Sequence, residues 1–231
     1  MNYVMADIHG EYDKFKKMLR LIEFRGEDNL FILGDMVDRG PEPIKLLMDV
    51  MMRNNVFCLL GNHEYMMSYV LEAMAVDIEE DNVEDQLSPT DLIAFDSWME
   101  NGGGVTCEQF RALDEEDQEM VLDFIQDLEL YEALEIDGQK FLLVHAGLSN
   151  FSKDRPLDDY APYELIHERP DYHKNYFDNI YTVTGHTPTL ELTGKPNIYK
   201  NGTHINIDCG ACFPEGRLAC LCLDTMEEFY V

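Results

Sequence analysis

The sequence predicts an α/β fold, a β-sandwich of two sheets with helices on its outer faces. Three observations support this prediction. Up to residue 76, short apolar strands alternate with helix-like segments, as in parallel βαβ units. From residue 134 onward, short apolar runs follow one another across turn residues, which indicates a second, mostly antiparallel sheet. The 231 residues and 45% apolar content suit a single domain over residues 1–231 with a sizeable core.

The first part of the chain predicts three strands, each followed by a helix. The strands are 2–6, 30–33 and 56–60, and the helices are 11–24, 41–53 and 63–76. Pro41 suits the first turn of a helix. Asp7, Asp35 and Asn62 each follow one of the strands and lie about one βαβ unit apart. We therefore expect three parallel neighbours whose carboxyl ends meet at one edge of the sheet, where ligands bind in open α/β sheets.

An acidic helical insertion over about 77–130 separates the two halves. Its first residues, 77–85, are an acidic run that we expect to be an exposed loop or a frayed helix end. A helix begins at the cap Ser88 and continues through Trp98. Glycines 102–104 break it, and a second helix follows over 114–130.

The second half predicts strands only. Asp137-Gly138 is a hairpin turn signal between strands 134–136 and 140–144. A further strand is expected at 180–184. The last three, 203–207, 217–223 and 226–231, are expected to form an antiparallel meander.

The net charge of −29 argues against nucleic-acid and anionic-membrane partners, because both are bound through Lys and Arg. Residues 72–137 hold 22 acids and one base, a net −21 of this total. These acids form a solvated face or attract a basic protein. The sequence has no signal-peptide pattern at its start and no apolar run long enough for a membrane span, so we expect a soluble, cytoplasmic protein. Its oligomeric state stays open.

The six cysteines are expected to be reduced thiols. Cys209 and Cys212, with Cys220 and Cys222, have the spacing of a zinc knuckle. The alternation of Cys220 and Cys222 along an apolar strand favours core packing instead. A thiol-nucleophile phosphatase needs a Cys-x5-Arg loop, and Cys212 and Arg217 are one residue too close for it.

Three short motifs end the first three strands. They are Asp7-Ile8-His9-Gly10, Gly34-Asp35-Met36-Val37-Asp38-Arg39-Gly40 and Gly61-Asn62-His63-Glu64. Together they resemble the metallophosphoesterases, specifically the phosphoprotein phosphatase branch that includes calcineurin and the small bacterial and phage serine/threonine protein phosphatases. The resemblance covers roughly 1–70, 98–104 and 140–223. It implies a calcineurin-like sandwich of two mixed sheets in a four-layer α/β/β/α arrangement.

The resemblance implies a two-metal-dependent phosphomonoesterase, most simply a protein serine/threonine phosphatase, with a metal-bridging hydroxide as nucleophile. Asp35 would bridge the two divalent ions. The first ion would also be held by Asp7 and His9, and the second by Asn62, His145 and His186. Imidazole with carboxylate and amide oxygens suits manganese, iron or zinc, and we expect manganese.

Phosphate recognition and proton transfer are implied for a further set of residues. Arg39 would form a bidentate pair with phosphoryl oxygens, and Asn62 would contact substrate as well as metal. The second phosphate-binding arginine is Arg155 or Arg169, and Leu165-Ile166-His167-Glu168-Arg169 resembles the bacterial Leu-Leu-Trp-x-Arg pattern and favours Arg169. His63 would protonate the leaving oxygen, and Asp38 would orient its ring.

Other substrates and roles stay open. A hydrolase of small phosphorylated molecules, including diadenosine tetraphosphate, is the main alternative. Asp38 and Glu64 argue against that nucleotide, because enzymes that cleave it symmetrically tend to have Ala and Asp at these two motif positions. An RNA-end phosphatase is disfavoured by the charge. A catalytically silent phosphoprotein-binding module would be expected to lose a metal ligand, and no ligand is lost here.

Overall fold

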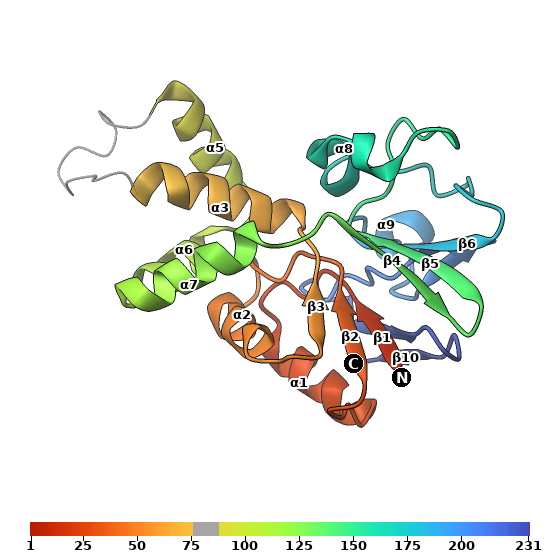
Figure 1. Cartoon of the computed structure of the whole chain (residues 1–231). Coiled ribbons are helices and arrows are strands. Elements are labelled where there is room, and N and C mark those ends of the chain that lie inside the picture. Colours follow the sequence, from red (N-terminus) through yellow and green to blue (C-terminus); the bar gives the residue numbers. More distant parts are fainter. Residues whose placement is uncertain (76–87) are drawn as a thin grey trace.

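The computed structural model describes residues 1–75 and 88–231, so the acidic run 77–85 lies outside the described residues. Two five-stranded sheets carry the fold, with strand orders β10-β9-β1-β2-β3 and β4-β5-β6-β8-β7. Helices flank both sheets (Figure 1). The predicted α/β sandwich of two mixed sheets is confirmed.

The first sheet contains the three predicted parallel strands. Its members are β1 (Asn2–Met5), β2 (Asn29–Ile32), β3 (Val56–Cys58), β9 (Ala219–Cys222) and β10 (Glu228–Tyr230). β1 pairs in parallel with β2, and β2 with β3. β9 adds antiparallel to the other side of β1, and β10 adds antiparallel to β9. The carboxyl ends of β1, β2 and β3 therefore lie at one edge, as expected.

The second sheet is mixed rather than mostly antiparallel. Its members are β4 (Tyr131–Ile136), β5 (Gln139–Val144), β6 (Ile180–Thr184), β7 (Tyr199–Asn201) and β8 (His204–Asn206). β4 and β5 form the predicted hairpin, whereas β5, β6 and β8 run parallel. The predicted C-terminal meander is wrong, because β8 pairs with β6 and β7 here while β9 and β10 join the first sheet.

The helices before residue 130 share one core with the first sheet. They are α1 (Tyr12–Leu21), α2 (Pro43–Met51), α3 (Asn62–Ala75), α5 (Pro89–Glu100), α6 (Gly104–Arg111) and α7 (Glu115–Gln126). Trp98 of α5, Phe110 of α6 and Val121 of α7 are buried in the same cluster as Met5 and Phe15. The helix α6 was not predicted, because its first residue belongs to the glycine run read as a breaker.

A second core fills the space between the two sheets. Val4 and Phe31 of the first sheet pack against Phe141, Val183 and Ile205 of the second. Successive side chains of a strand point to opposite faces of its sheet, so one set packs in this core and the other set faces the helices outside. Burying apolar surface on both faces of each sheet stabilises the sandwich by about 25 cal/mol per Å². The two sheets are therefore held together by this shared core.

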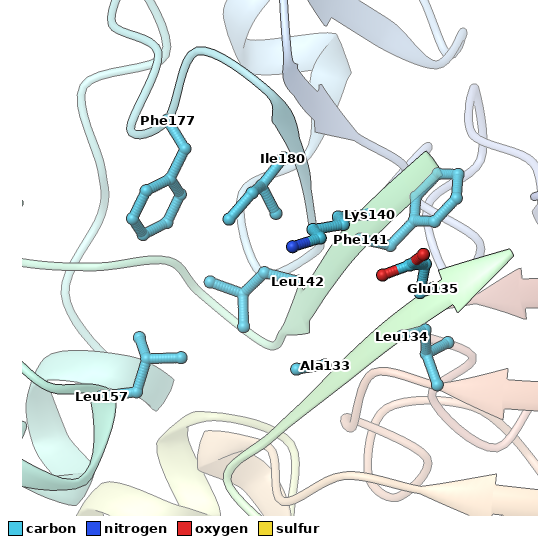
Figure 2. Close-up of a pocket in the computed structure, with 9 residues that line it drawn as sticks. All are labelled: Ala133, Leu134, Glu135, Lys140, Phe141, Leu142, Leu157, Phe177 and Ile180. Atoms are coloured by element: carbon cyan, nitrogen blue, oxygen red, sulfur yellow. The ribbon is translucent and has the colours of Figure 1, made fainter. Parts of the chain in front are cut away.

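The outer face of the second sheet carries short helices and a pocket. The elements there are the 3-10 turn Leu157–Asp159, α8 (Pro162–Ile166) and α9 (Thr189–Thr193). The pocket, of about 270 Å³, lies beside β4 and β5, with Leu142, Phe177 and Ile180 among its apolar walls and Lys140 and Glu135 also lining it (Figure 2). Among the described residues, no helix is both long and apolar enough to span a membrane.

Candidate metal and phosphate site

The predicted metal ligands converge where strands of both sheets end. Asp7 and His9 follow β1, Asp35 follows β2, Asn62 begins α3, and His145 and His186 follow β5 and β6. All are buried except His186, which is partly exposed. Four of the six have left-handed backbone: Asp7 (φ 52°), His9 (46°), Asp35 (52°) and His186 (66°). Such a conformation costs a non-glycine residue of order 1 kcal/mol and is found where side chains are aimed for function.

One half of the site brings together nitrogen and oxygen atoms that can donate electron pairs to a metal ion. Nδ1 of His145 donates to the carbonyl of Leu33 at 2.6 Å, so its Nε2 is unprotonated. That Nε2 faces Oδ1 of Asn62 at 3.0 Å, Nδ1 of His186 at 3.2 Å and Oδ1 of Asp35 at 3.5 Å. Nδ1 of His186 also lies 2.8 Å from Oδ1 of Asn62, so all of these atoms could contact one cation. The arrangement fits a metal ion.

The other half is built around His9 and His63. Nδ1 of His9 donates to the carbonyl of Val37 at 2.8 Å, which leaves Nε2 unprotonated and 3.7 Å from Oδ2 of Asp35. Nε2 of His63 lies 3.8 Å from the same oxygen. Asp35 thus offers one carboxylate oxygen to each half, which is the geometry that a bridging ligand needs. His9, Asp35 and His63 form one candidate ligand group, and Asp35, His145 and His186 the other.

Buried charge also favours cations here. Burial raises the pKa of Asp7, and the carboxylates of Asp208 and Asp35 raise it further. Burial raises the pKa of Asp208 to about 7, again with help from Asp35. Three buried carboxylates near one another are costly unless positive charge compensates them. The side chain of Asp7 accepts from the backbone N–H of His186 at 3.0 Å, which ties the first sheet to the second.

The histidines are suited to bind metal because they are neutral. Burial lowers the pKa of His9 well below its usual range, and His63 lowers it further. Burial likewise lowers the pKa of His145, and it lowers that of His186 to about 3. Burial alone would raise the pKa of Asp35, but the surrounding imidazoles, His145 foremost, hold it well below its usual range. At neutral pH the site therefore presents the ionised carboxylate of Asp35 among neutral imidazoles, and these residues fit divalent metal ions.

Asp38 and His63 form a buried dyad. Nδ1 of His63 lies 2.6 Å from Oδ2 of Asp38, so this nitrogen carries the proton and Nε2 faces the site. The indole N–H of Trp98 and the hydroxyl of Thr106 donate to Asp38 at 3.0 and 2.6 Å. Burial would lower the pKa of His63, but Asp35 and Asp38 together raise it above its usual value. The roles of Trp98 and Thr106 were not predicted, since both come from the insertion.

Glu64 has a supporting role that was also not predicted. Its buried carboxylate accepts from the backbone N–H groups of Asp35 and Met36 at 2.7 Å and of Val37 and Gly61 at 3.1 Å. Burial raises the pKa of Glu64 to about 7. The side chain therefore fixes the loop after β2 against the start of α3. The position of Glu64 in the Gly-Asn-His-Glu motif was the feature of the sequence that could have indicated this role.

The three candidate arginines have different surroundings. Arg39 donates from Nη1 to Nε2 of His9 and from Nη2 to Nε2 of His63, both at 2.9 Å, so the predicted phosphate-binding group lies in the site. Arg169 instead pairs with Glu191 at 2.7 Å on the surface. Arg155 pairs with Glu164. The structure does not bring Arg169 to the metal ligands, and its phosphate role stays a prediction.

Relatives of known name are consistent with this chemistry. The symmetrical bis(5'-nucleosyl)-tetraphosphatase of Wigglesworthia glossinidia brevipalpis is 37% identical over 100 residues, which are 42% of this chain and 37% of the relative. The enzyme of the same name from Buchnera aphidicola subsp. Schizaphis graminum is 25% identical over 224 residues, 95% of this chain and 71% of the relative. The chain thus spans little more than a third of the length of the first relative.

Solved structures share the fold. A protein provisionally assigned as a diadenosine tetraphosphatase matches with a TM-score of 0.67 at 17% identity, over 100% of this chain and 92% of that one. A Saccharomyces cerevisiae protein serine/threonine phosphatase matches with a TM-score of 0.53 at 16% identity, over 95% and 72%. At these identities the likeness concerns the fold alone. The model of the calcineurin-like phosphoesterase family, however, matches residues 3–209, so the chain belongs to that family.

Proposed function

We propose that this protein is a divalent-metal-dependent phosphohydrolase of small nucleotide substrates, of the dinucleoside tetraphosphate class. The observation that carries the metal-dependent hydrolysis is the convergence of four histidine rings on the carboxylate of Asp35, beside the guanidinium of Arg39. The named relatives support the nucleotide substrate. This substrate replaces the phosphoprotein as the leading candidate.

The reaction is hydrolysis of a phosphoric anhydride. Water oxygen forms a bond to a central phosphorus, the bond from that phosphorus to its bridging oxygen breaks, and a nucleoside diphosphate departs with the electron pair. Cations held by the site would stabilise the negative charge and supply ionised water near neutral pH. Arg39 would pair with non-bridging oxygens of the phosphate under attack. Asn62 would orient the same group through its amide.

The dyad of His63 and Asp38 favours a second candidate, a phosphoserine or phosphothreonine phosphatase. An alkoxide is a strong base and needs a proton as it leaves, whereas a nucleoside diphosphate departs without one. His63 is held by Asp38 at 2.6 Å, and Asp35 and Asp38 raise its pKa, so its ring would take up a second proton on Nε2 and deliver that proton to the leaving oxygen. The protein phosphatase therefore stays the alternative within the same metal chemistry.

A substrate panel separates the two candidates. Metal-loaded protein is assayed with diadenosine tetraphosphate, a phosphoserine peptide and p-nitrophenyl phosphate. We expect the highest kcat/KM for the dinucleotide, with ADP as the only nucleotide product. Preference for the peptide would establish the second candidate instead.

Metal dependence is tested in the same assays. Chelation, or the substitution Asp35→Asn, is expected to lower all turnover at least 10²-fold, because one carboxylate serves both halves of the site. Elemental analysis of the loaded protein, with manganese as the expected metal, should give two ions per chain and a loss in the variant. Full activity after stripping would overturn the two-metal proposal.

A further inference from the structure

Two exposed aromatic rings lie on opposite halves of the metal site. Phe213 is 39% exposed, and its ring centre lies 5.9 Å from the guanidinium carbon of Arg39, on the side of His9 and His63. Tyr163 is 56% exposed and stacks on His167 with centroids 4.7 Å apart and planes 16° from parallel. The ring of His167 lies 6.2 Å from that of His186, on the other half.

Phe213 is held in place by its loop. Its N–H donates to the carbonyl of Gly210 at 2.9 Å, and the loop closes where the N–H of Arg217 donates to the carbonyl of Cys209 at 3.0 Å. Gly210 has a φ of 73°, and a Cβ there would meet the Phe213 ring at 3.1 Å. The ring therefore lies over bare backbone and keeps another part of its surface in solvent.

Tyr163 is equally fixed relative to the metal ligands. It lies in α8, whose Leu165 carbonyl accepts from the N–H of Ala146, next to His145, at 2.9 Å. The start of this helix is secured by Glu164, which accepts from the N–H of Ala161 at 2.9 Å and from Arg155 at 2.7 Å. One face of Tyr163 is stacked on His167, and more than half of the residue is open to solvent. In Figure 1, α8 lies beside the ends of β5 and β6.

We infer that Phe213 and the Tyr163–His167 pair are platforms on which the two bases of a dinucleoside polyphosphate stack. The inference rests on the proposed function and adds how the nucleosides are recognised. A phosphate chain over Arg39 would leave one nucleoside toward each ring. Exposed aromatic surface is unfavourable in water, and stacking a base on it removes that cost.

The net negative charge of the molecule means that a polyphosphate substrate needs a source of affinity other than electrostatic attraction. A net charge of −29 opposes the approach of a polyphosphate, and Arg39 is the only one of the candidate arginines that the structure places at the metal ligands. Uncharged stacking surfaces supply affinity that does not depend on the electrostatic field. Stacking also tolerates different bases, since every base has a π-face.

The test compares substrates with and without bases. In metal-loaded protein, Tyr163→Ala and Phe213→Ala are each expected to lower kcat/KM for diadenosine tetraphosphate about 5- to 150-fold, the range typical of one stacked base. The loss for inorganic tripolyphosphate, which has the anhydride and no base, should be much smaller. Tyr163→Phe and Phe213→Tyr keep a ring and should restore the dinucleotide rate. Phe57→Ala, an equally exposed ring on β3 (46%), is the matched control that leaves both substrates unchanged.

Binding gives a readout independent of turnover. Stacking quenches the fluorescence of etheno-ADP, so its titration should show quenching with the parent protein and at least 5-fold weaker binding with each alanine variant. Equal losses for dinucleotide and tripolyphosphate, or unchanged etheno-ADP binding, overturn the platforms and leave the proposed function standing. If the parent protein cleaves p-nitrophenyl phosphate and neither cleaves nor binds any nucleotide, the platforms and the proposed substrate are both wrong.

Discussion

At the residue scale, His63 and Arg39 are adjacent in space but have different chemical roles. The proton on Nδ1 of His63 is committed to Asp38, so only Nε2 can exchange a proton with substrate. Arg39 donates toward that nitrogen and toward His9, which places a fixed positive charge between them. A leaving group that needs a proton will depend on the first residue, whereas every phosphoryl group will depend on the second.

Substitution should separate these roles. Under single-turnover conditions, where chemistry limits the rates, His63→Asn is expected to slow a phosphoserine peptide about 10²- to 10⁴-fold, the range of general-acid help, and p-nitrophenyl phosphate far less, because p-nitrophenolate leaves unprotonated. Arg39→Ala should slow both by similar factors. If His63→Asn slows both substrates equally, another proton donor must be assigned.

A buried histidine outside the metal site predicts an acid limit to stability. His204 in β8 is 5.0 Å from the ring of Tyr172 and nearly parallel to it, and burial lowers its pKa to about 4. The backbone of Lys174 and then the charge of Asp171 raise this pKa, but by less than burial lowers it. The unfolded chain binds the proton near pH 6.5, so below that pH protons favour the unfolded state. Above pH 6.5, His204 is neutral in the folded and the unfolded protein and does not reduce stability. As the pH falls from 6.5 toward 4, the free energy of unfolding decreases.

The expected loss is about 3 kcal/mol at most between pH 6.5 and 4. It is measured by urea unfolding of metal-free protein at several pH values, for the parent and for His204→Gln. The difference between the two curves removes the contribution of the other histidines. The parent should lose stability more steeply than the variant over this window. Parallel curves would mean that His204 titrates normally in the fold.

At the scale of elements, the hairpin β4–β5 depends on its two turn residues. Asp137 has a φ of 50° and Gly138 a φ of 82°, the left-handed pair that a tight hairpin requires. Gly138→Ala is expected to destabilise the protein by about 1–2 kcal/mol, because Cβ is unfavourable in that conformation. Gly104, the first residue of α6, has open space around its Cα, and Gly104→Ala is expected to stabilise by about 0.4–1 kcal/mol.

Chemical denaturation of both variants tests this pair, since the same substitution should change stability in opposite directions. Equal effects would indicate that backbone conformation does not decide the outcome at Gly138. The comparison needs no metal and no substrate. It therefore reports on the fold alone.

The elements that were predicted correctly are those whose signals are local. Apolar periodicity, caps and the Asp137-Gly138 turn decide where a helix or strand begins and ends, and these lie within a few residues. Pairing partners are different, because β8 was placed beside β9 on sequence proximity and in fact pairs with β6. That choice depends on apolar surfaces distant in the chain. The helix α6 was not predicted because the local signal pointed the wrong way. Glycine has a low helix propensity, and the packing of Phe110 in the core outweighs it.

The same distinction applies to the site. The convergence of Asp35, Asn62 and His145 could be predicted because each lies within a few residues of the end of an apolar strand, and their roles as metal ligands stay a prediction from the family resemblance. The contacts of Trp98 and Thr106 could not, because these residues reach Asp38 from 60 and 68 residues away and lie outside the three motifs that end the strands. Which arginine accompanies Arg39 also depends on side-chain conformation, which a motif does not specify.

At the scale of the whole molecule, the charge of −29 should make stability depend on salt. Like charges repel more strongly in the compact state, and salt screens them with a Debye length of about 10 Å at 0.1 M. Raising NaCl from about 10 to 150 mM at pH 7.5 is expected to raise the Tm of chelated protein by about 2–4 °C, which corresponds to about 1 kcal/mol in a chain of this size.

Calorimetry measures this effect, and pH provides the control. Near pH 5, closer to the isoelectric point of about 4.3, the net charge is smaller and the salt response should shrink. A Tm that is flat or falls with salt at pH 7.5 would contradict self-repulsion as a significant cost. The acidic run 77–85 contributes to this charge wherever it lies.

Hydrogen bonds between the two sheets at the site are expected to make the protein unfold in one step. His145 of the second sheet donates to Leu33 of the first, and Asp7 of the first accepts from the backbone of His186 in the second. Neither sheet alone holds all of the proposed metal ligands. A partly unfolded intermediate that kept only one sheet would have lost the ligands that the other supplies, so metal release and loss of tertiary structure should occur in one transition. An indicator dye that reports free metal would then follow global unfolding of this protein in real time.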